Sequence, residues 1–264
     1  MDFTKPPSPA AVRAARQDLE LEAARVGVAA PPLERVYECL RRIETGEVDA
    51  VPGQRAAVFA FPGLRAQPWH DPARLPWHAR LLEHVASIRE EALALWEELR
   101  FRRHPKEHLV PTGTWGQYYL FSYGTKLEDH CGRVPLTTRL VESIPEIGAA
   151  GSVFFASIAP GTRIAPHYGP FNHRLRTHLS LVVPAGDLGI RVGGRTRRWE
   201  EGRCLVFDDT FEHECHNLGE GARIVLLVDS WHPELSEVER WGIERILGYF
   251  FDNARRVEAM RAGG

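Results

Sequence analysis

Residues 152–186 read SVFFASIAPGTRIAPHYGPFNHRLRTHLSLVVPAG, and this stretch decides the fold class. It holds two runs rich in β-branched and aromatic residues, separated by Gly and Pro turn signals, which is typical of short strands. Five further runs of this kind lie between about residues 110 and 232: WGQYYLFSYG, LGIRVGG, RTRRWEEG, RCLVFDD and RIVLLVDSWH. Seven or more short strands at close spacing predict an antiparallel sandwich or barrel rather than βαβ units.

Helices are expected on both sides of this β region. Apolar residues at helical spacing predict an amphipathic helix that ends near Gly46, and a second helix from Trp77 to Arg102, the longest in the chain. A short helix is expected near LTTRLVESIPEIG and a terminal one over residues 234–260. Residues 10–26 can form a helix with a thin apolar face, and the proline-rich segment 59–77 is expected to be an extended connector.

These predictions describe a mainly β protein with flanking helices. We expect an N-terminal helical extension over residues 1–60 and a main domain over residues 61–264, with a β core at about 110–232 and a C-terminal helix.

Composition excludes several classes of partner. The net charge is about -2 and the basic residues are scattered, so neither nucleic acid nor an anionic membrane surface is expected as a partner. No run approaches the roughly 20 apolar residues of a membrane span, and the N-terminus lacks the features of a secretory signal, so we expect a cytoplasmic protein. The cysteines form no CxxC pair, which argues against a structural zinc site and a disulfide framework: Cys39, Cys131, Cys204 and Cys215.

Three polar side chains alternate along the strand that follows residue 173. Because side chains two apart on a strand share a face, Arg174, Arg176 and His178 point one way. If that face is inside a small barrel, two guanidiniums and an imidazole form a wall that binds anions such as carboxylates. The alternative is an outward polar face of an amphipathic strand.

Two histidines are candidate metal ligands. His167 follows a Pro/Gly turn, and His213 follows an acidic turn between two strands. Imidazoles on neighbouring strands of a barrel can present adjacent coordination positions to iron, which leaves room for a bidentate 2-oxo acid and for oxygen. Of the other histidines, His173 and His216 are expected on loops or outward faces, and His232 is expected to be structural.

The segments PGTRIAPHYGPFNHRLRTHLSLVVP, WEEGRCLVFDDTFEHE and RIVLLVDSWHPEL resemble the aspartyl/asparaginyl β-hydroxylase family. Weaker similarity in FPGLRAQPW, SIREEALALW and GTWGQYYLFSYG extends the resemblance over roughly residues 60 to 235. It implies a double-stranded β-helix, the jelly roll of the cupins, and a dioxygenase that uses Fe(II), 2-oxoglutarate and O2.

The resemblance also implies roles for individual residues. His167 and His213 match the two iron ligands, and Arg223 matches the arginine for the distal carboxylate of 2-oxoglutarate. Arg176 and His178 match residues near its 1-carboxylate, and Arg176 is also expected to act in catalysis. Most 2-oxoglutarate oxygenases place an Asp or Glu ligand two residues after the first histidine. That position is Gly169 here, as in this family, while Asp209 matches an acid near the metal that is expected to act through water.

Three departures from the family pattern affect these roles. A serine that helps to hold 2-oxoglutarate aligns with Ala156, so the neighbouring Ser157 is the candidate in its place. Cys131 aligns with one cysteine of a disulfide, but its partner is missing, so the bridge is not expected. The helical repeat domain of the animal members is reduced to one or two helices, which bears on substrate choice.

The expected reaction is hydroxylation of an unactivated C–H bond of an amino-acid side chain, such as the β-carbon of Asp or Asn, in a peptide or protein. Succinate and CO2 are the expected co-products. One alternative is tailoring of a biosynthetic peptide or free amino acid, including halogenation if a halide enters at Gly169. Another is a cupin-like binding module without catalysis. The sequence does not choose the substrate or the oligomeric state.

Overall fold

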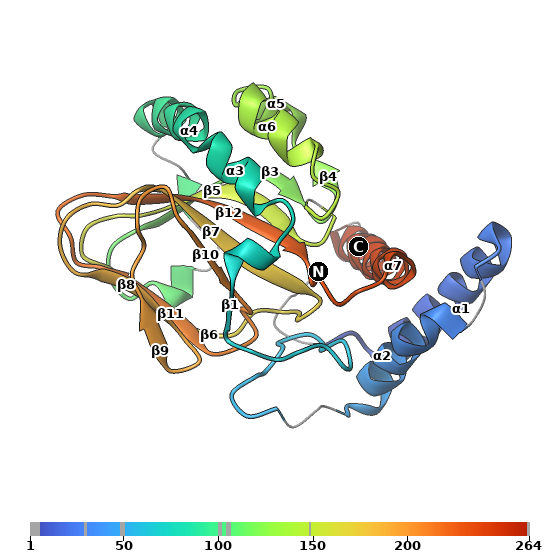
Figure 1. Cartoon of the computed structure of the whole chain (residues 1–264). Helices are drawn as coiled ribbons and strands as arrows, with labels where there is room; N and C mark the ends of the chain where they lie inside the picture. Colours follow the sequence, from blue (N-terminus) through green and yellow to red (C-terminus); the bar gives the residue numbers. More distant parts are fainter. Residues whose placement is uncertain are drawn as a thin grey trace.

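The β core of the computed structural model consists of two antiparallel sheets (Figure 1). The structure describes residues 6–28, 31–47, 51–99, 102–103, 107–147 and 149–262. The strands of the large sheet are, in spatial order, β1 (Trp69–His70), β10 (Cys204–Phe207), β7 (Arg174–Val182), β12 (Arg223–Trp231), β5 (Ser152–Ile158), β3 (Trp115–Ser122) and β2 (Arg102–Arg103), with β4 (Thr125–Lys126) also paired to β3. The small sheet is ordered β6 (Thr162–His167), β11 (His213–Asn217), β8 (Leu188–Val192) and β9 (Arg195–Arg197).

The strand order identifies the fold. Between β5 and β12 the chain passes repeatedly from one sheet to the other, and the large sheet runs β10-β7-β12-β5 while the small one runs β6-β11-β8-β9. Eight strands in two facing sheets with these connections form a jelly roll. The predicted double-stranded β-helix is therefore confirmed. Two of its strands, β6 and β11, were not among the seven runs recognised in the sequence.

Alternation along each strand of the large sheet separates an inner from an outer face. On β5, Phe154 and Ala156 belong to the core between the two sheets, whereas Val153 and Phe155 belong to a second core on the outer side. The inner core contains buried residues from both sheets and from the connections between them: Phe154, Ala156, Ile158, Ile164, Leu188, Ile190, Val192, Trp199, Phe207, Phe211, Val225 and Leu227.

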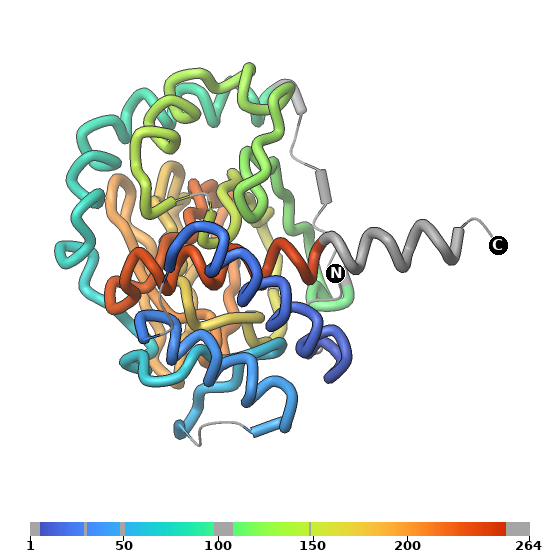
Figure 2. Tube along the Cα trace, turned by 90° about the vertical axis from the view of Figure 1, so that its right-hand side faces the viewer, coloured from blue at the N-terminus to red at the C-terminus, as the bar shows by residue number. Residues whose placement is uncertain are grey.

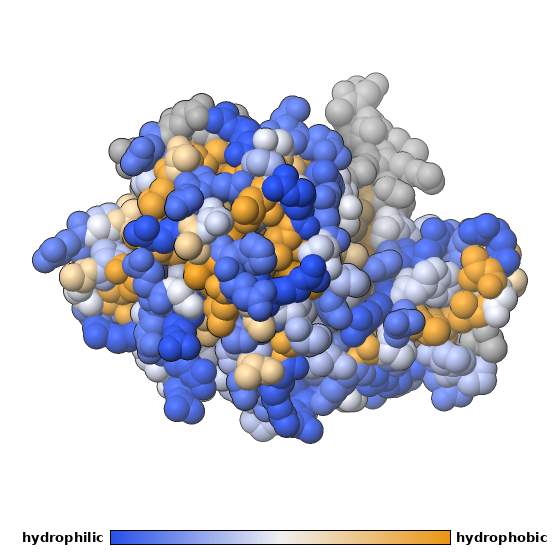
Figure 3. Space-filling view, turned by 45° about the horizontal axis from the view of Figure 1, so that its top comes forward, coloured by the Kyte–Doolittle hydropathy of each residue, from blue (hydrophilic) through white to orange (hydrophobic). Residues whose placement is uncertain are grey.

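Helices cover the outer face of the large sheet. They are α3 (His78–Glu83), α4 (Val85–Leu99), α5 (Glu128–Cys131) and α6 (Pro135–Glu142) (Figure 1). Seen from their side, apolar side chains gather near the middle of this surface, with hydrophilic ones around them (Figure 3). The single helix predicted from Trp77 to Arg102 is wrong, because His84 leaves helical geometry and its ring Nδ1 bonds the carbonyl oxygen of Arg80. The longest helix is instead α7 (Glu237–Ala262).

The N-terminal helices pack against the C-terminal one. α1 (Pro9–Val26) and α2 (Glu34–Thr45) lie beside α7 (Figure 2), and the three share an apolar core with Phe61 and Trp231. The thin apolar face of α1, which includes Val12 and Leu19, is buried there. Arg35 of α2 adds a bidentate ion pair with Glu239 of α7. None of the helices described is both long and apolar enough to cross a membrane.

Candidate active site

The two predicted metal ligands face each other across neighbouring strands of the small sheet. His167 is the last residue of β6 and His213 the first of β11, and the two are direct partners in the antiparallel pairing. Their ring centroids are 4.0 Å apart. Residues 46 positions apart in the chain are thus held side by side, which is the arrangement that two ligands of one metal ion require.

Backbone carbonyls fix which nitrogen of each ring carries the proton. Nδ1 of His167 lies 2.8 Å from the oxygen of Ala165, and Nδ1 of His213 lies 3.0 Å from the oxygen of Phe211. A carbonyl oxygen only accepts, so both Nδ1 atoms donate and both Nε2 atoms carry the lone pair. Histidines that bind metals commonly have this second-shell bond, which fixes the tautomer and the ring orientation.

Gly169 lacks a side chain for a steric reason. A Cβ atom at this position would lie 2.2 Å from both Cγ and Oδ1 of Asp209. The carboxylate of Asp209 therefore occupies the space that a third, carboxylate ligand at position 169 would need. The space that the acid of the usual facial triad would need is thus filled by an acid from the connection before His213, which is held by ion pairs with Arg174 and Arg176.

Asp209 belongs to a buried cluster of two arginines and two aspartates. Its Oδ2 is 3.1 Å from Nη2 of Arg174 and 2.9 Å from Nη1 of Arg176. Asp229 pairs with both arginines, and Nε of Arg176 is 2.9 Å from its Oδ1. Burial lowers the pKa of Arg176, but the carboxylates of Asp229 and Asp209 outweigh burial and raise it above its ordinary value.

The cluster refines the predicted anion-binding wall. Arg174 and Arg176 share the inner face of β7, so the alternative of an outward polar face is wrong. Their charges are balanced by two aspartates, so the wall is neutral overall. The side chain of Arg176 retains 19% exposure against 2% for Arg174, and Arg176 is therefore the member that a ligand can reach.

A second buried group surrounds Trp199. Its indole Nε1 donates to Nδ1 of His178 at 3.3 Å, and the guanidinium of Arg223 lies over its ring at 4.5 Å from the centroid. Burial, followed by the charges of Arg223 and Arg176, lowers the pKa of His178 well below its ordinary value. Because Nδ1 accepts from the indole, the neutral ring carries its proton on Nε2 and can donate a hydrogen bond to a ligand.

Arg223 is built to receive a partner. It is buried, at 2% exposure, and its Nε and Nη1 have no hydrogen-bond partner within the described structure. Burial lowers its pKa to about 10, so the side chain is still a cation at neutral pH. A buried cation with unsatisfied donors is unfavourable unless a ligand pairs with it, and a carboxylate fits its fork of donors.

A chain of ring contacts joins the histidine pair to Arg223. The ring of His213 lies 5.9 Å from Phe207, which lies 5.1 Å from His178, which in turn lies 6.2 Å from Trp199. The metal-ligand candidates and the carboxylate-binding candidates therefore line one interior, between the two sheets.

One predicted site residue faces the wrong way. Ser157 alternates with Val153 and Phe155, so it points to the outer face of β5, while Ala156 points into the barrel. Ser157 is therefore not placed to hold a ligand inside the barrel. His173 lies in the connection between β6 and β7, as expected, but it is fully buried among aromatic rings rather than on an outward face.

Two important residues were not identified in the sequence. Trp199 and Asp229 contact His178 and Arg176, but each comes from a distant part of the chain. For Asp229 the signal was available, because an acid within the strand run RIVLLVDSWH is unusual and must find a buried partner. Trp199 carried no such signal.

The donor set fits a metal and a 2-oxo acid. Two neutral imidazoles with lone pairs on Nε2 suit iron, and Arg223 with His178 suits the two ends of a dicarboxylate. Within the described residues, no cluster of three or more His, Cys, Asp or Glu side chains is placed to hold a metal ion. All four cysteines are free thiols.

Comparison with known proteins assigns the chain to a family. A family model described as aspartyl/asparaginyl beta-hydroxylase matches residues 82–233. Aspartyl/asparaginyl beta-hydroxylase of Homo sapiens is 37% identical over 196 residues, which is 72% of this chain and 26% of that protein. Ornithine lipid ester-linked acyl 2-hydroxylase of Rhizobium tropici is 34% identical over 174 residues, or 63% of this chain and 61% of that protein.

In its fold, the chain resembles solved structures that are only distantly similar in sequence, of which one serves as an example. A predicted oxalate decarboxylase from Thermotoga maritima has a TM-score of 0.33 and 13% identity, and the match covers 49% of this chain and 90% of that one. The chain spans about a quarter of the human relative, 26% of its length. Since the family model covers more than half of the chain and both histidines lie within it, the chain belongs to the aspartyl/asparaginyl β-hydroxylase family.

Proposed function

We propose that this chain is a hydroxylase that depends on iron(II) and 2-oxoglutarate. The observation that carries the proposal is the pairing of His167 with His213 in the same interior as the buried, unsatisfied guanidinium of Arg223. When bound, iron(II), 2-oxoglutarate and O2 together supply the oxidising chemistry, which ends in succinate, CO2 and a hydroxylated C–H bond.

The side chains divide this work. His167 and His213 would hold iron(II) through Nε2, since their Nδ1 atoms already donate to carbonyls. Arg223 would bind the distal carboxylate of 2-oxoglutarate. His178, held by Trp199, would donate from Nε2 to the 1-carboxylate.

Arg176 and Asp209 would act beside the metal. Arg176 is the more accessible arginine of the ion-pair cluster and would orient the co-substrate or a polar substrate. Asp209 is held by two arginines and would act on a metal-bound water rather than bind the metal directly.

For the substrate we propose an amino-acid side chain in a peptide or protein, or a free amino acid. The relatives carry names with different substrates, an aspartyl or asparaginyl residue in one and the acyl chain of a lipid in another. An assay should therefore include an acyl-chain arm.

Halogenation is opposed by the geometry. A halide at the iron would need the space next to Gly169, where the carboxylate of Asp209 lies. An anion placed beside that carboxylate would be repelled. We therefore propose hydroxylation in preference to halogenation.

The decisive experiment has two readouts. Iron content after anaerobic loading should approach one ion per chain, and it should fall in His167→Ala and His213→Ala but not in His216→Ala, a matched control on the outer part of β11. Succinate release should then be screened over Asp- and Asn-containing peptides, free amino acids and an acyl-chain substrate. Iron bound equally well without either histidine, or no 2-oxoglutarate turnover with any substrate, would favour a binding module instead.

A further inference from the structure

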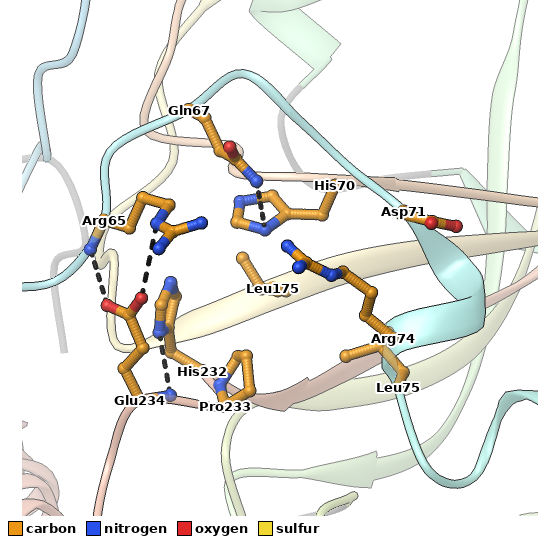
Figure 4. A pocket seen from close by; sticks show the side chains of 10 residues that line it. All are labelled: Arg65, Gln67, His70, Asp71, Arg74, Leu75, Leu175, His232, Pro233 and Glu234. Atoms are coloured by element: carbon orange, nitrogen blue, oxygen red, sulfur yellow. Dashed lines mark hydrogen bonds and ion pairs between the residues drawn. The ribbon is translucent and has the colours of Figure 1, made fainter.

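A pocket lies outside the barrel, at the end of the large sheet near β1. It is formed by the connector that contains Arg65, His70 and Arg74, by Leu175 of β7, and by the turn after β12 that contains His232 (Figure 4). It is separate from the candidate active site, because Leu175 points to the outer face of β7 whereas its neighbours Arg174 and Arg176 point inward.

Two histidine donors in this pocket are buried without a partner. The backbone N–H of Glu234 donates to Nδ1 of His232 at 3.3 Å, so the proton of this ring is on Nε2. Gln67 donates in the same way to Nδ1 of His70 at 3.1 Å. Nε2 of both rings is inaccessible to solvent and has no hydrogen-bond partner among the residues described.

The two imidazoles act as neutral donors. They lie edge to face with centroids 5.8 Å apart, and His232 is only 2% exposed. Burial lowers the pKa of His70 to about 4 and also lowers that of His232. A buried N–H without an acceptor is unfavourable. Two such groups at one pocket indicate a ligand with acceptor oxygens.

The charges in the pocket select an anion. Arg65 pairs with Glu234 in two ways. Nε of Arg65 lies 3.5 Å from Oε1 of Glu234, and the backbone N–H of Arg65 donates to Oε2 of Glu234 at 2.8 Å. Asp71 also lines the pocket, but its carboxylate caps the backbone N–H of Ala73 and is turned away from the two imidazoles (Figure 4). Arg74 has no ion-pair partner in the described part of the chain, and its guanidinium faces the same space as the imidazoles (Figure 4). One positive charge is therefore left for a ligand.

The same geometry excludes a metal as the ligand. A histidine binds a metal through a nitrogen that carries a lone pair. In both rings that nitrogen, Nδ1, already accepts a hydrogen bond from within the chain, and Nε2 carries the proton.

We propose that this pocket binds a compact oxyanion, either a phosphate or a carboxylate group, through the Nε2–H groups of His70 and His232 and the guanidinium of Arg74. The oxygens of such a group accept the two buried donors and pair with the cation at once. The site is independent of the proposed activity, because no residue of it belongs to the candidate active site.

The test is a titration of the full chain with inorganic phosphate and, separately, with acetate, each at constant ionic strength. Binding is measured by calorimetry and by the shifts of the imidazole 1H–15N resonances of His70 and His232. The variants are Arg74→Ala and His70→Phe, with Arg80→Ala as a matched control on the exposed surface of α3. The background variant Arg223→Ala removes carboxylate binding at the candidate active site.

We expect binding in the wild type, Arg80→Ala and Arg223→Ala, with shifts of both Nε2–H resonances. Binding should weaken at least about tenfold in Arg74→Ala and His70→Phe. A response to phosphate alone identifies a phosphoryl group as the ligand, and a response to acetate as well identifies a carboxylate. No response to either anion at roughly 10 mM, or binding that is unchanged in both variants, overturns the proposal.

Discussion

Replacing Gly169 by alanine tests how tightly the candidate active site is packed. The added Cβ would lie 2.2 Å from two atoms of the Asp209 carboxylate and 2.5 Å from a third, whereas carbon atoms in contact normally approach no closer than about 3.5 Å. Neither partner can retreat easily. The backbone N–H of Gly169 donates to the backbone oxygen of Asp209 at 2.6 Å, and its carbonyl oxygen accepts from the N–H of Ala57 at 2.9 Å. The side-chain carboxylate of Asp209 is held by Arg174 and Arg176.

The expected loss of stability follows from two contributions. Overpacking a well-packed interior by one methyl group costs about 1–3 kcal/mol. Moving Asp209 away from its arginines adds part of the roughly 3–5 kcal/mol that complete loss of a buried ionic partner costs. We expect the free energy of unfolding to fall by about 2–4 kcal/mol in total.

Chemical denaturation of the metal-free protein measures this difference. Gly248→Ala is the matched control, since a Cβ atom at this helical glycine would point into open space. The free energy of unfolding of this variant should be unchanged or slightly higher. Gly169→Asp should lose at least as much stability as Gly169→Ala and should bind no more iron than the wild type. A loss below about 0.5 kcal/mol in Gly169→Ala, within the range of ordinary surface changes, would refute this account of the site.

Three further predictions follow from the site and its surroundings. Arg223→Ala should raise the KM for 2-oxoglutarate in a succinate assay by roughly 100-fold through loss of a charged pair, and unchanged kinetics would remove the assignment. Trp199→Phe keeps a ring beneath Arg223 but loses the N–H that donates to His178. The KM for 2-oxoglutarate should therefore rise by a factor of roughly 3–10 in this variant, and by more in Trp199→Ala. A KM in Trp199→Phe equal to that of the wild type would show that the indole N–H has no role. Burial lowers the pKa of His173 to about 3, below its value of about 6.5 in the unfolded chain. Its contribution to stability is therefore complete above pH 6.5 and is lost as the pH falls toward 3, by roughly 3 kcal/mol at pH 4. In His173→Gln the decrease in unfolding free energy between pH 6.5 and 4 should be shallower, and an identical slope would contradict the assignment.

The sequence alone determined the features that depend on local periodicity. Alternation along residues 174–178 placed Arg174, Arg176 and His178 on one face before any partner strand was known, because successive side chains of a strand point to opposite sides. The number and spacing of the strand runs likewise predicted an antiparallel sandwich or barrel, and the family resemblance specified the jelly roll. Motif order, through the family resemblance, supplied His167 and His213.

Only the tertiary structure decided which groups meet across the barrel. The pairing of β6 with β11 brings the ring centroids of His167 and His213 to 4.0 Å from each other. The same packing puts the carboxylate of Asp209 into the space beside Gly169. Ser157 shows the limit of the sequence: it is only one residue from Ala156, which faces the interior, but a shift of one residue along a strand reverses the face, so Ser157 points outward. Period and turn chemistry are properties of a few consecutive residues, whereas strand partners, the inner face and buried charge pairs depend on contacts between residues far apart in the chain.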